Sequence, residues 1–141
     1  MPSNPTPPSS PEPCAPVLTH AATDAQRSCY LECAVATMCA VEDAIALLTA
    51  RQVLPALASD ERRLITIELA DLEARRVKVR AQMYAFIAGQ QAIRPPSKDD
   101  HDRVKALAKE LDALTAHATF TRTVLDTTSE LLALYNRAVE L

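Results

Sequence analysis

The chain has 141 residues, of which 48% are hydrophobic, and a formal net charge of −3. This composition excludes wholesale disorder and gives no electrostatic reason to expect binding to nucleic acid or to an acidic membrane. Gly89 is the only glycine, which excludes the glycine-rich loops that cradle nucleotide phosphates.

Residues 1–22 differ in composition from the rest of the chain. Residues 1–16 contain seven of the ten prolines, and four of the other nine residues are Ser or Thr. Such a segment favours extended, solvated backbone over packed structure. It has neither the basic start nor the apolar stretch of a signal peptide. We therefore predict a disordered Pro/Ser-rich leader over residues 1–22 and a helical bundle over residues 23–141.

The first predicted helix covers residues 24–52, with Thr23 or Asp24 as its N-cap. Its main apolar stripe alternates steps of three and four residues, which is a heptad pattern. Pro55 ends the pattern, because a residue before proline is pushed out of helical backbone. The stripe consists of Leu31, Ala34, Met38, Val41, Ile45, Leu48 and Gln52.

The second predicted helix covers residues 60–92. Ser59 is its expected N-cap, and Asp60 and Glu61 lie in the first turn, where the helix dipole favours negative charge. Gly89 weakens the last turn, and Pro95 with Pro96 prevents continuation. The apolar stripe is Ile65, Leu69, Leu72, Arg76, Val79, Met83 and Phe86, in which Arg76 is the one charged member.

The third predicted helix covers residues 98–139 and begins at a capping sequence formed by Ser97 and Asp100. A heptad pattern runs through this whole range, although its centre is rich in Thr. At 1.5 Å per residue such a helix is about 63 Å long. Because the connections are short, we predict an all-α, elongated, antiparallel, coiled-coil-like bundle of three helices.

The first helix has a second apolar face opposite its main stripe. The two neighbours of a helix in a three-helix bundle lie on a common arc, so they leave the opposite side uncovered. We therefore predict that this face binds another protein or a second copy, and that Ala40→Glu disrupts association more than folding. Alternatively, both stripes serve one core. The predicted interface residues are Cys33, Ala36, Ala40, Ala44 and Leu47, together with Arg76 as a polar seam residue.

The cysteines are interpreted as small buried hydrophobic residues. Cys29 and Cys33 lie one helical turn apart, however, so the alternative is a metal site that Cys14 and His20 of the leader help to complete. The acidic residues around His101 are interpreted as residues of a helix start, where the positive end of the helix dipole favours negative charge.

We find no nucleophile with a base and an orienting group, so the sequence predicts no enzyme and no cofactor. The expected function is that of a non-catalytic helical protein-interaction module, such as an adaptor, a secretion chaperone or an immunity-type binding protein. A Cys-based metal- or thiol-binding protein is the alternative. Three acids within residues 29–50 argue against a membrane span, and the expected location is the cytoplasm.

Overall fold

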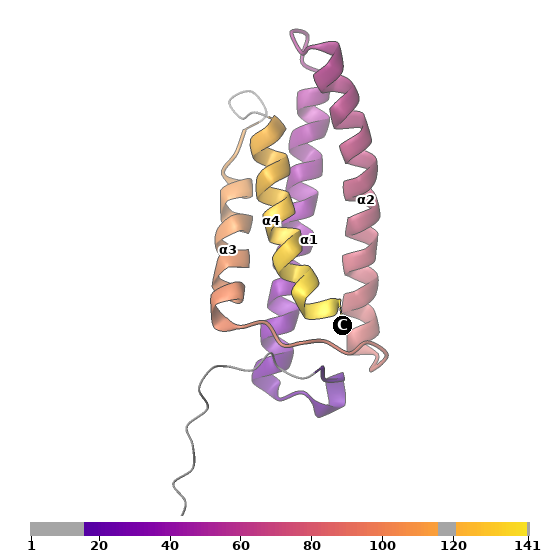
Figure 1. Cartoon of the computed structure of the whole chain (residues 1–141), viewed down its shortest axis with the longest axis vertical. Helices are drawn as coiled ribbons and strands as arrows, with labels where there is room; N and C mark the ends of the chain where they lie inside the picture. Colours follow the sequence, from indigo (N-terminus) through magenta and orange to yellow (C-terminus); the bar gives the residue numbers. More distant parts are fainter. Residues whose placement is uncertain (1–15, 116–120, 141) are drawn as a thin grey trace, which may run out of the picture.

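The computed structural model describes residues 16–115 and 121–140, and these residues form an all-helical fold without a β-strand (Figure 1). The helices run alternately up and down, and each packs along at least one other. They are α1 (Asp24–Gln52), α2 (Ser59–Ile87), α3 (Lys98–Asp112) and α4 (Thr121–Val139), preceded by a short 3₁₀ turn at Thr19–Ala21.

The prediction of three helices is wrong, because the range 98–139 does not form one continuous helix. α3 ends at Asp112, and α4 begins at Thr121 and runs back alongside α3 (Figure 1). A single helix of about 63 Å would extend well past α1, whose 29 residues span about 44 Å. Reversal of the chain lets both halves bury their apolar faces against α1. The β-branched run at residues 119–124 lies at this break, and residues 116–120 are outside the described residues.

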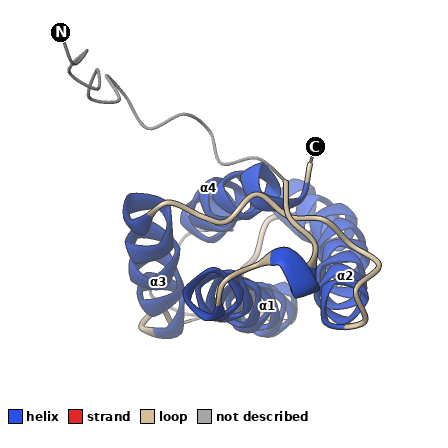
Figure 2. Cartoon of the chain, turned by 90° about the horizontal axis from the view of Figure 1, so that it is seen from below, coloured by secondary structure: helices blue, strands red, loops and turns tan. Residues whose placement is uncertain are grey.

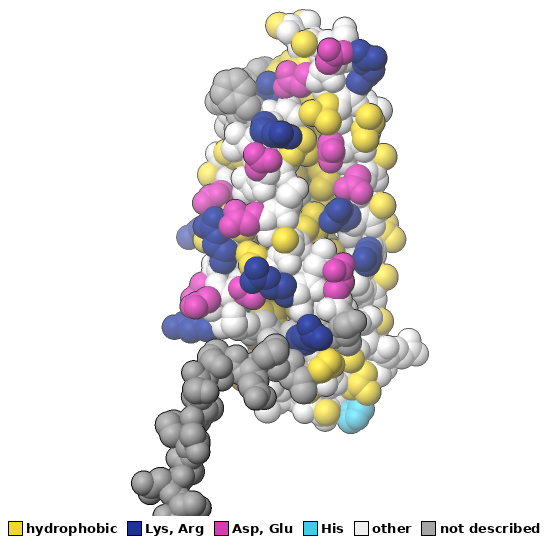
Figure 3. Space-filling view, in the orientation of Figure 1, with side chains coloured by type: hydrophobic (Ala, Val, Ile, Leu, Met, Phe, Trp, Pro, Cys, Tyr) yellow, Lys and Arg dark blue, Asp and Glu magenta, His cyan; other side chains and the backbone are white. Residues whose placement is uncertain are grey.

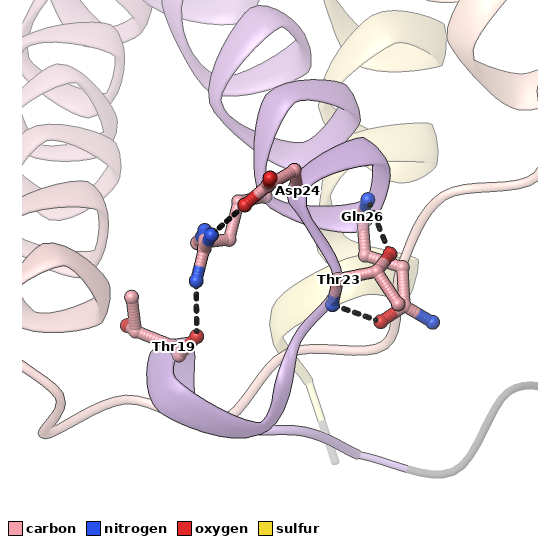
Figure 4. A network of polar contacts seen from close by, with 5 residues as sticks. Thr19, Thr23, Asp24 and Gln26 are labelled. Atoms are coloured by element: carbon pink, nitrogen blue, oxygen red, sulfur yellow. Dashed lines mark hydrogen bonds and ion pairs between the residues drawn. The ribbon is translucent and has the colours of Figure 1, made fainter.

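Local chemistry determines where α1 begins. The Thr23 side chain accepts a hydrogen bond from the Gln26 backbone N–H, and the Gln26 side chain accepts one from the Thr23 N–H, which is a complete capping box (Figure 4). Arg27 pairs with Asp24 and also donates to the Thr19 carbonyl. The 3₁₀ turn is therefore tied to the first turn of α1.

Both ends of α2 differ from the prediction. The N-cap is Ala58, and Ser59 is already helical. At the other end α2 stops at Ile87 and does not continue to residue 92, because Gly89 adopts φ of +78°. The N–H of Gly89 bonds to the Phe86 carbonyl, and that of Gln90 to the Ala85 carbonyl, which completes a Schellman cap. The N-cap of α3 is Ser97, as predicted.

Part of the predicted leader packs on the bundle. Val17 and Ile93 exchange two backbone hydrogen bonds of 2.7 and 2.9 Å, and Ile93 is fully buried. The N–H of Arg94 donates to the carbonyl of Ala138, which connects the same linker to the end of α4. The end of the predicted leader is therefore attached to the bundle through its backbone. The predicted disorder of residues 1–15 concerns a segment outside the described residues.

The core lies where α2, α3 and α4 meet α1, which is the central helix (Figure 2). The Tyr30 and Phe86 rings meet edge to face at 4.8 Å, and the Tyr30 hydroxyl lies 3.2 Å from that of Tyr135. The Tyr135 hydroxyl donates to Gln82 at 3.0 Å. α1, α2 and α4 are therefore joined by a buried polar contact inside an apolar core.

Candidate functional site

The strongest grouping of chemically reactive side chains lies between the start of α1 and the start of α3. Cys29 and Cys33 project from successive turns of α1, and His101 projects from the first turns of α3. The two sulfur atoms and a ring nitrogen of His101 all lie within 4.8 Å of one another. Cys33 is buried, whereas Cys29 and His101 are partly accessible.

Polar groups surround this cluster and orient its members. The carboxylate of Glu32 lies 2.8 Å from Nε2 of His101, and Lys105 lies 3.8 Å from the same carboxylate. The thiol of Cys29 donates to the carbonyl of Pro96 over 3.6 Å. The histidine ring is therefore oriented by α1 as well as by its own helix.

Burial keeps the thiols protonated in the absence of a ligand. It raises the pKa of the Cys33 thiol to about 12, with a further contribution from neighbouring Cys29. Burial also raises the pKa of Cys29, and the charge of Glu32 adds to that shift. Both thiols are therefore weak nucleophiles at neutral pH, because the thiolate is the reactive form.

The sequence interpretation selected a different histidine. His20 is exposed in the 3₁₀ turn and is not part of the cluster found among the described residues. His101 belongs to it, although 68 residues separate it from Cys33 along the chain. Pairwise spacing within one helix could not reveal that contact. Cys14 and His117 lie outside the described residues.

The second apolar face of α1 is covered largely by α3. Ala40 and Ala44 are fully buried, and Cys33 is nearly so. Ala36 and Leu47 are half-buried and border open grooves between α1 and α3. The larger groove has a volume of about 620 Å³, and Lys105, Lys109 and Asp112 contribute to its lining.

This packing removes the argument that pointed to an interface on α1. The argument required a helix with two neighbours, and α1 packs against three. The alternative, in which both stripes serve one core, describes the structure better. The sixth predicted interface residue, Arg76, is half-buried on α2 and pairs with Glu73 at 2.9 Å.

The outer side of α2 has an apolar face that sequence analysis missed. It repeats in steps of three and four residues, as a heptad seam does. Every residue of this outer seam is exposed, and Figure 3 shows hydrophobic side chains along the right-hand edge, over α2. The outer seam consists of Ile67, Ala70, Ala74, Val77, Ala81, Tyr84 and Ala88.

Length and composition alone would also allow α1 to cross a membrane. Its apolar residues, however, form the contacts with α2, α3 and α4. The central helix of a soluble bundle has the same apolar composition, because it is buried on most sides. That α1 does not span a membrane remains a prediction.

Comparison of the chain with protein-family models, with curated proteins and with solved structures finds no match. Functional inference therefore depends on the chemistry and exposure of the described residues.

Proposed function

We propose that the protein is a non-catalytic helical interaction module that binds a second copy of itself through the outer seam of α2. The observation that carries this proposal is the exposure of large apolar side chains at heptad spacing. Ile67 is 67% exposed, Val77 61% and Tyr84 53%. Contiguous apolar surface of this kind marks contact sites on soluble proteins.

The geometry of α2 explains why the outer seam is free. Leu72, Val79 and Phe86 are buried on the inner side of α2 and lie at the heptad positions farthest from the outer seam. One side of the helix thus serves the core of its own chain. The opposite side repeats the pattern with no described element over it.

The seam residues are complementary to themselves in an antiparallel pair. A two-fold axis halfway between Ala74 and Val77 pairs six of the seven seam residues with one another across the two chains, and Ala88 lies opposite Arg63. Small residues face each other in one layer and large residues face each other in another, so the side-chain volume differs between the layers. The matched layers are Ile67 with Tyr84, Ala70 with Ala81, and Ala74 with Val77.

Charge also favours this arrangement. Asp71 and Glu73 border the first half of the outer seam, and Lys78 and Arg80 border the second half. The same two-fold axis brings Asp71 towards Lys78 of the second copy, and Glu73 towards Arg80 of the second copy. Both acids already pair with an arginine of their own helix, but their side chains remain 53% and 49% exposed. They are thus available to a second cation.

The size of the contact sets the expected strength. The seven positions span 22 residues and about 33 Å, and a helix is about 10 Å wide, so each chain contributes roughly 330 Å². A standard stable interface buries about 800 Å² per partner. We therefore expect a weak dimer with a dissociation constant in the micromolar range and not a permanent one.

Light scattering over a concentration series tests the proposal. We expect the mass to rise from 15.3 kDa towards twice that value. Ala74→Lys should raise the dissociation constant at least tenfold, because it places two ammonium groups beside the two-fold axis. Ala133→Lys is the matched control, since Ala133 is exposed on α4. A strict monomer at all concentrations, or equal effects of the two variants, would contradict the proposal.

A charge-exchange experiment tests the orientation. Asp71→Lys and Lys78→Glu each place like charges opposite one another in an antiparallel homodimer. A mixture of the two variants restores both attractive pairs, so mixed samples should associate more strongly than either variant alone. In a parallel pair Asp71 faces Thr66, and mixing would leave the repulsion caused by Lys78→Glu. Absence of recovery on mixing would therefore rule out the antiparallel arrangement.

A further inference from the structure

We propose that Cys29, Cys33 and His101 bind a divalent metal ion of the zinc class, with two thiolates and one imidazole as ligands. This inference is independent of the self-association proposed above. Borderline-soft ions such as Zn²⁺ prefer this set of sulfur and nitrogen donors. The described residues bring the three donors together from two helices that are far apart in sequence.

The distances require only a small adjustment. Zn–S bonds are about 2.3 Å and Zn–N bonds about 2.0 Å, so ligand atoms of a tetrahedral site lie roughly 3.3–3.8 Å apart. The three donor atoms lie within 4.8 Å of one another. Contraction by about 1 Å is within the reach of side-chain rotation, while α1 and α3 stay in place.

Rigid elements hold the ligands. Cys29 and Cys33 lie one turn apart on the central helix, where the capping box at Thr23 and Gln26 fixes the first turn. The cap at Ser97 determines where α3 begins, and thereby the position of His101.

Glu32 is the carboxylate partner that metal-binding histidines usually have on their other ring nitrogen. When Nε2 of His101 carries the proton and donates it to Glu32, Nδ1 keeps a lone pair for the metal. Lys105 lies 3.8 Å from Glu32 and helps to hold that carboxylate in place. The ring is thereby held in one tautomer and one orientation.

Accessibility and coordination number point to an open site. The side chain of His101 is 17% exposed, and Cys29 is partly exposed, so an ion can reach the cluster from solvent. Three protein ligands leave a fourth position for water or for a small exogenous donor. Among the described residues, the structure thus assigns three ligands to the site.

Binding exchanges protons for the metal. Two S–H bonds break, two sulfur–metal bonds form, and two protons leave to the solvent, while the neutral imidazole adds through its lone pair. No oxidant or reductant is required. Because two protons leave for each ion bound, the affinity should fall as the solution is acidified.

Titration of Co²⁺ into the reduced, metal-free full chain is the direct test. We expect one ion per chain, with the intense visible bands of four-coordinate cobalt and a sulfur-to-cobalt charge-transfer band in the near ultraviolet. Zn²⁺ should displace Co²⁺ and abolish both. A pale six-coordinate spectrum without charge transfer, or no saturation at one equivalent, would overturn the proposal.

Variants identify the ligands. His101→Gln and Cys29→Ser should each weaken Zn²⁺ binding at least 100-fold in competition with a chelator, and Glu32→Gln about tenfold. Cys39→Ser and His20→Gln are matched controls, because both residues are exposed and outside the cluster. Loss of the cobalt spectrum in the controls, or its survival in His101→Gln, would contradict the assignment.

One further design separates folding from binding. Cys33 is buried, and its replacement could unfold the chain, whereas His101 and Cys29 are partly accessible. Circular dichroism of His101→Gln should match that of the unaltered protein without metal. If the helical signal is kept and the cobalt spectrum is lost, the effect belongs to the ligand and not to the fold.

Discussion

α1 and α2 are both 29 residues long, and each has apolar residues on two opposite sides, but the two helices differ in whether the second side is buried. The second face of α1 is covered by α3 of the same chain, so Ala40 and Ala44 are fully buried. The second face of α2 has no described neighbour and stays exposed. An excess apolar face therefore indicates a partner only after every helix of the chain has been placed.

The largest expected effect separates the two faces directly. Ala40→Glu inserts a carboxylate at a fully buried position between α1 and α3 and should lower the free energy of unfolding by about 3 kcal/mol. Ala81→Glu makes the same change on the exposed outer seam and should alter monomer stability by less than about 0.5 kcal/mol. Chemical denaturation at a concentration below dimer formation measures both.

The opposite result would reverse the comparison. If Ala40→Glu leaves unfolding unchanged, the second face of α1 is open, and the original prediction of an interface there regains its basis. If Ala81→Glu unfolds the monomer, the outer seam is part of the core.

A second pair of variants tests which element covers α1. Leu107 is buried on α3, and Leu107→Ala should reduce the free energy of unfolding by about 2–4 kcal/mol through the cavity it leaves. Ile67→Ala removes a similar apolar volume from the outer seam of α2 and should cost under about 0.5 kcal/mol in the monomer. The same variant should weaken dimer formation. Equal losses of stability in the two variants would contradict the distinction drawn between the two faces.

Sequence periodicity predicted the helical class and the span of α1 correctly, because hydrophobic spacing and caps are local properties. Thr23 and Ser97 do form caps. The end of α2 depended on Gly89, whose positive φ stops the helix. In a single sequence, a glycine that only weakens a helix cannot be distinguished from a glycine that ends it.

The break between α3 and α4 could not be read from periodicity, because both halves keep a heptad pattern and a common phase. Only the length of the neighbouring helices makes one continuous helix unfavourable. Because the fourth helix was not predicted, α1 was expected to have only two neighbours and an uncovered second face. His101 was missed for the same reason, since only α3 placed against α1 brings it beside Cys29 and Cys33.

The leader offers a prediction of intermediate size. Deletion of residues 1–22 removes both backbone hydrogen bonds between Val17 and Ile93 and uncovers the buried Ile93 side chain. We expect a loss of about 2 kcal/mol and a lower thermal midpoint. Deletion of residues 1–15 is the matched control, because it leaves those contacts intact. Equal midpoints for the two deletions would show that the bridge contributes no stability.

Alkaline pH tests the core contact that joins α1, α2 and α4. Burial raises the pKa of both Tyr30 and Tyr135. The folded state then holds these protons more tightly than the unfolded chain, whose tyrosines titrate near pH 10. Stability should therefore be constant below about pH 10 and fall as the pH rises further.

Replacement of a tyrosine by phenylalanine shows whether its ionisation causes that loss of stability. Tyr30→Phe removes one ionisable group and should flatten the fall in stability above about pH 10, at a cost of about 1 kcal/mol at neutral pH for the lost hydroxyl contact. An unaltered fall in stability above about pH 10 in Tyr30→Phe would contradict the assignment.

The smallest expected effect on stability comes from thiol alkylation. Its rate measures how well α3 covers α1. Cys39 is exposed at the groove, whereas Cys33 lies under α3 with a pKa of about 12. Alkylation requires an accessible thiolate, so Cys39 should react on the order of 100-fold faster than Cys33. Mass spectrometry of Cys14→Ser after timed alkylation separates the remaining sites. Leu107→Ala should accelerate Cys33 selectively, because it loosens the packing of α3 on α1. Reaction of Cys33 as fast as Cys39 in the unaltered fold would mean that α3 does not protect this face.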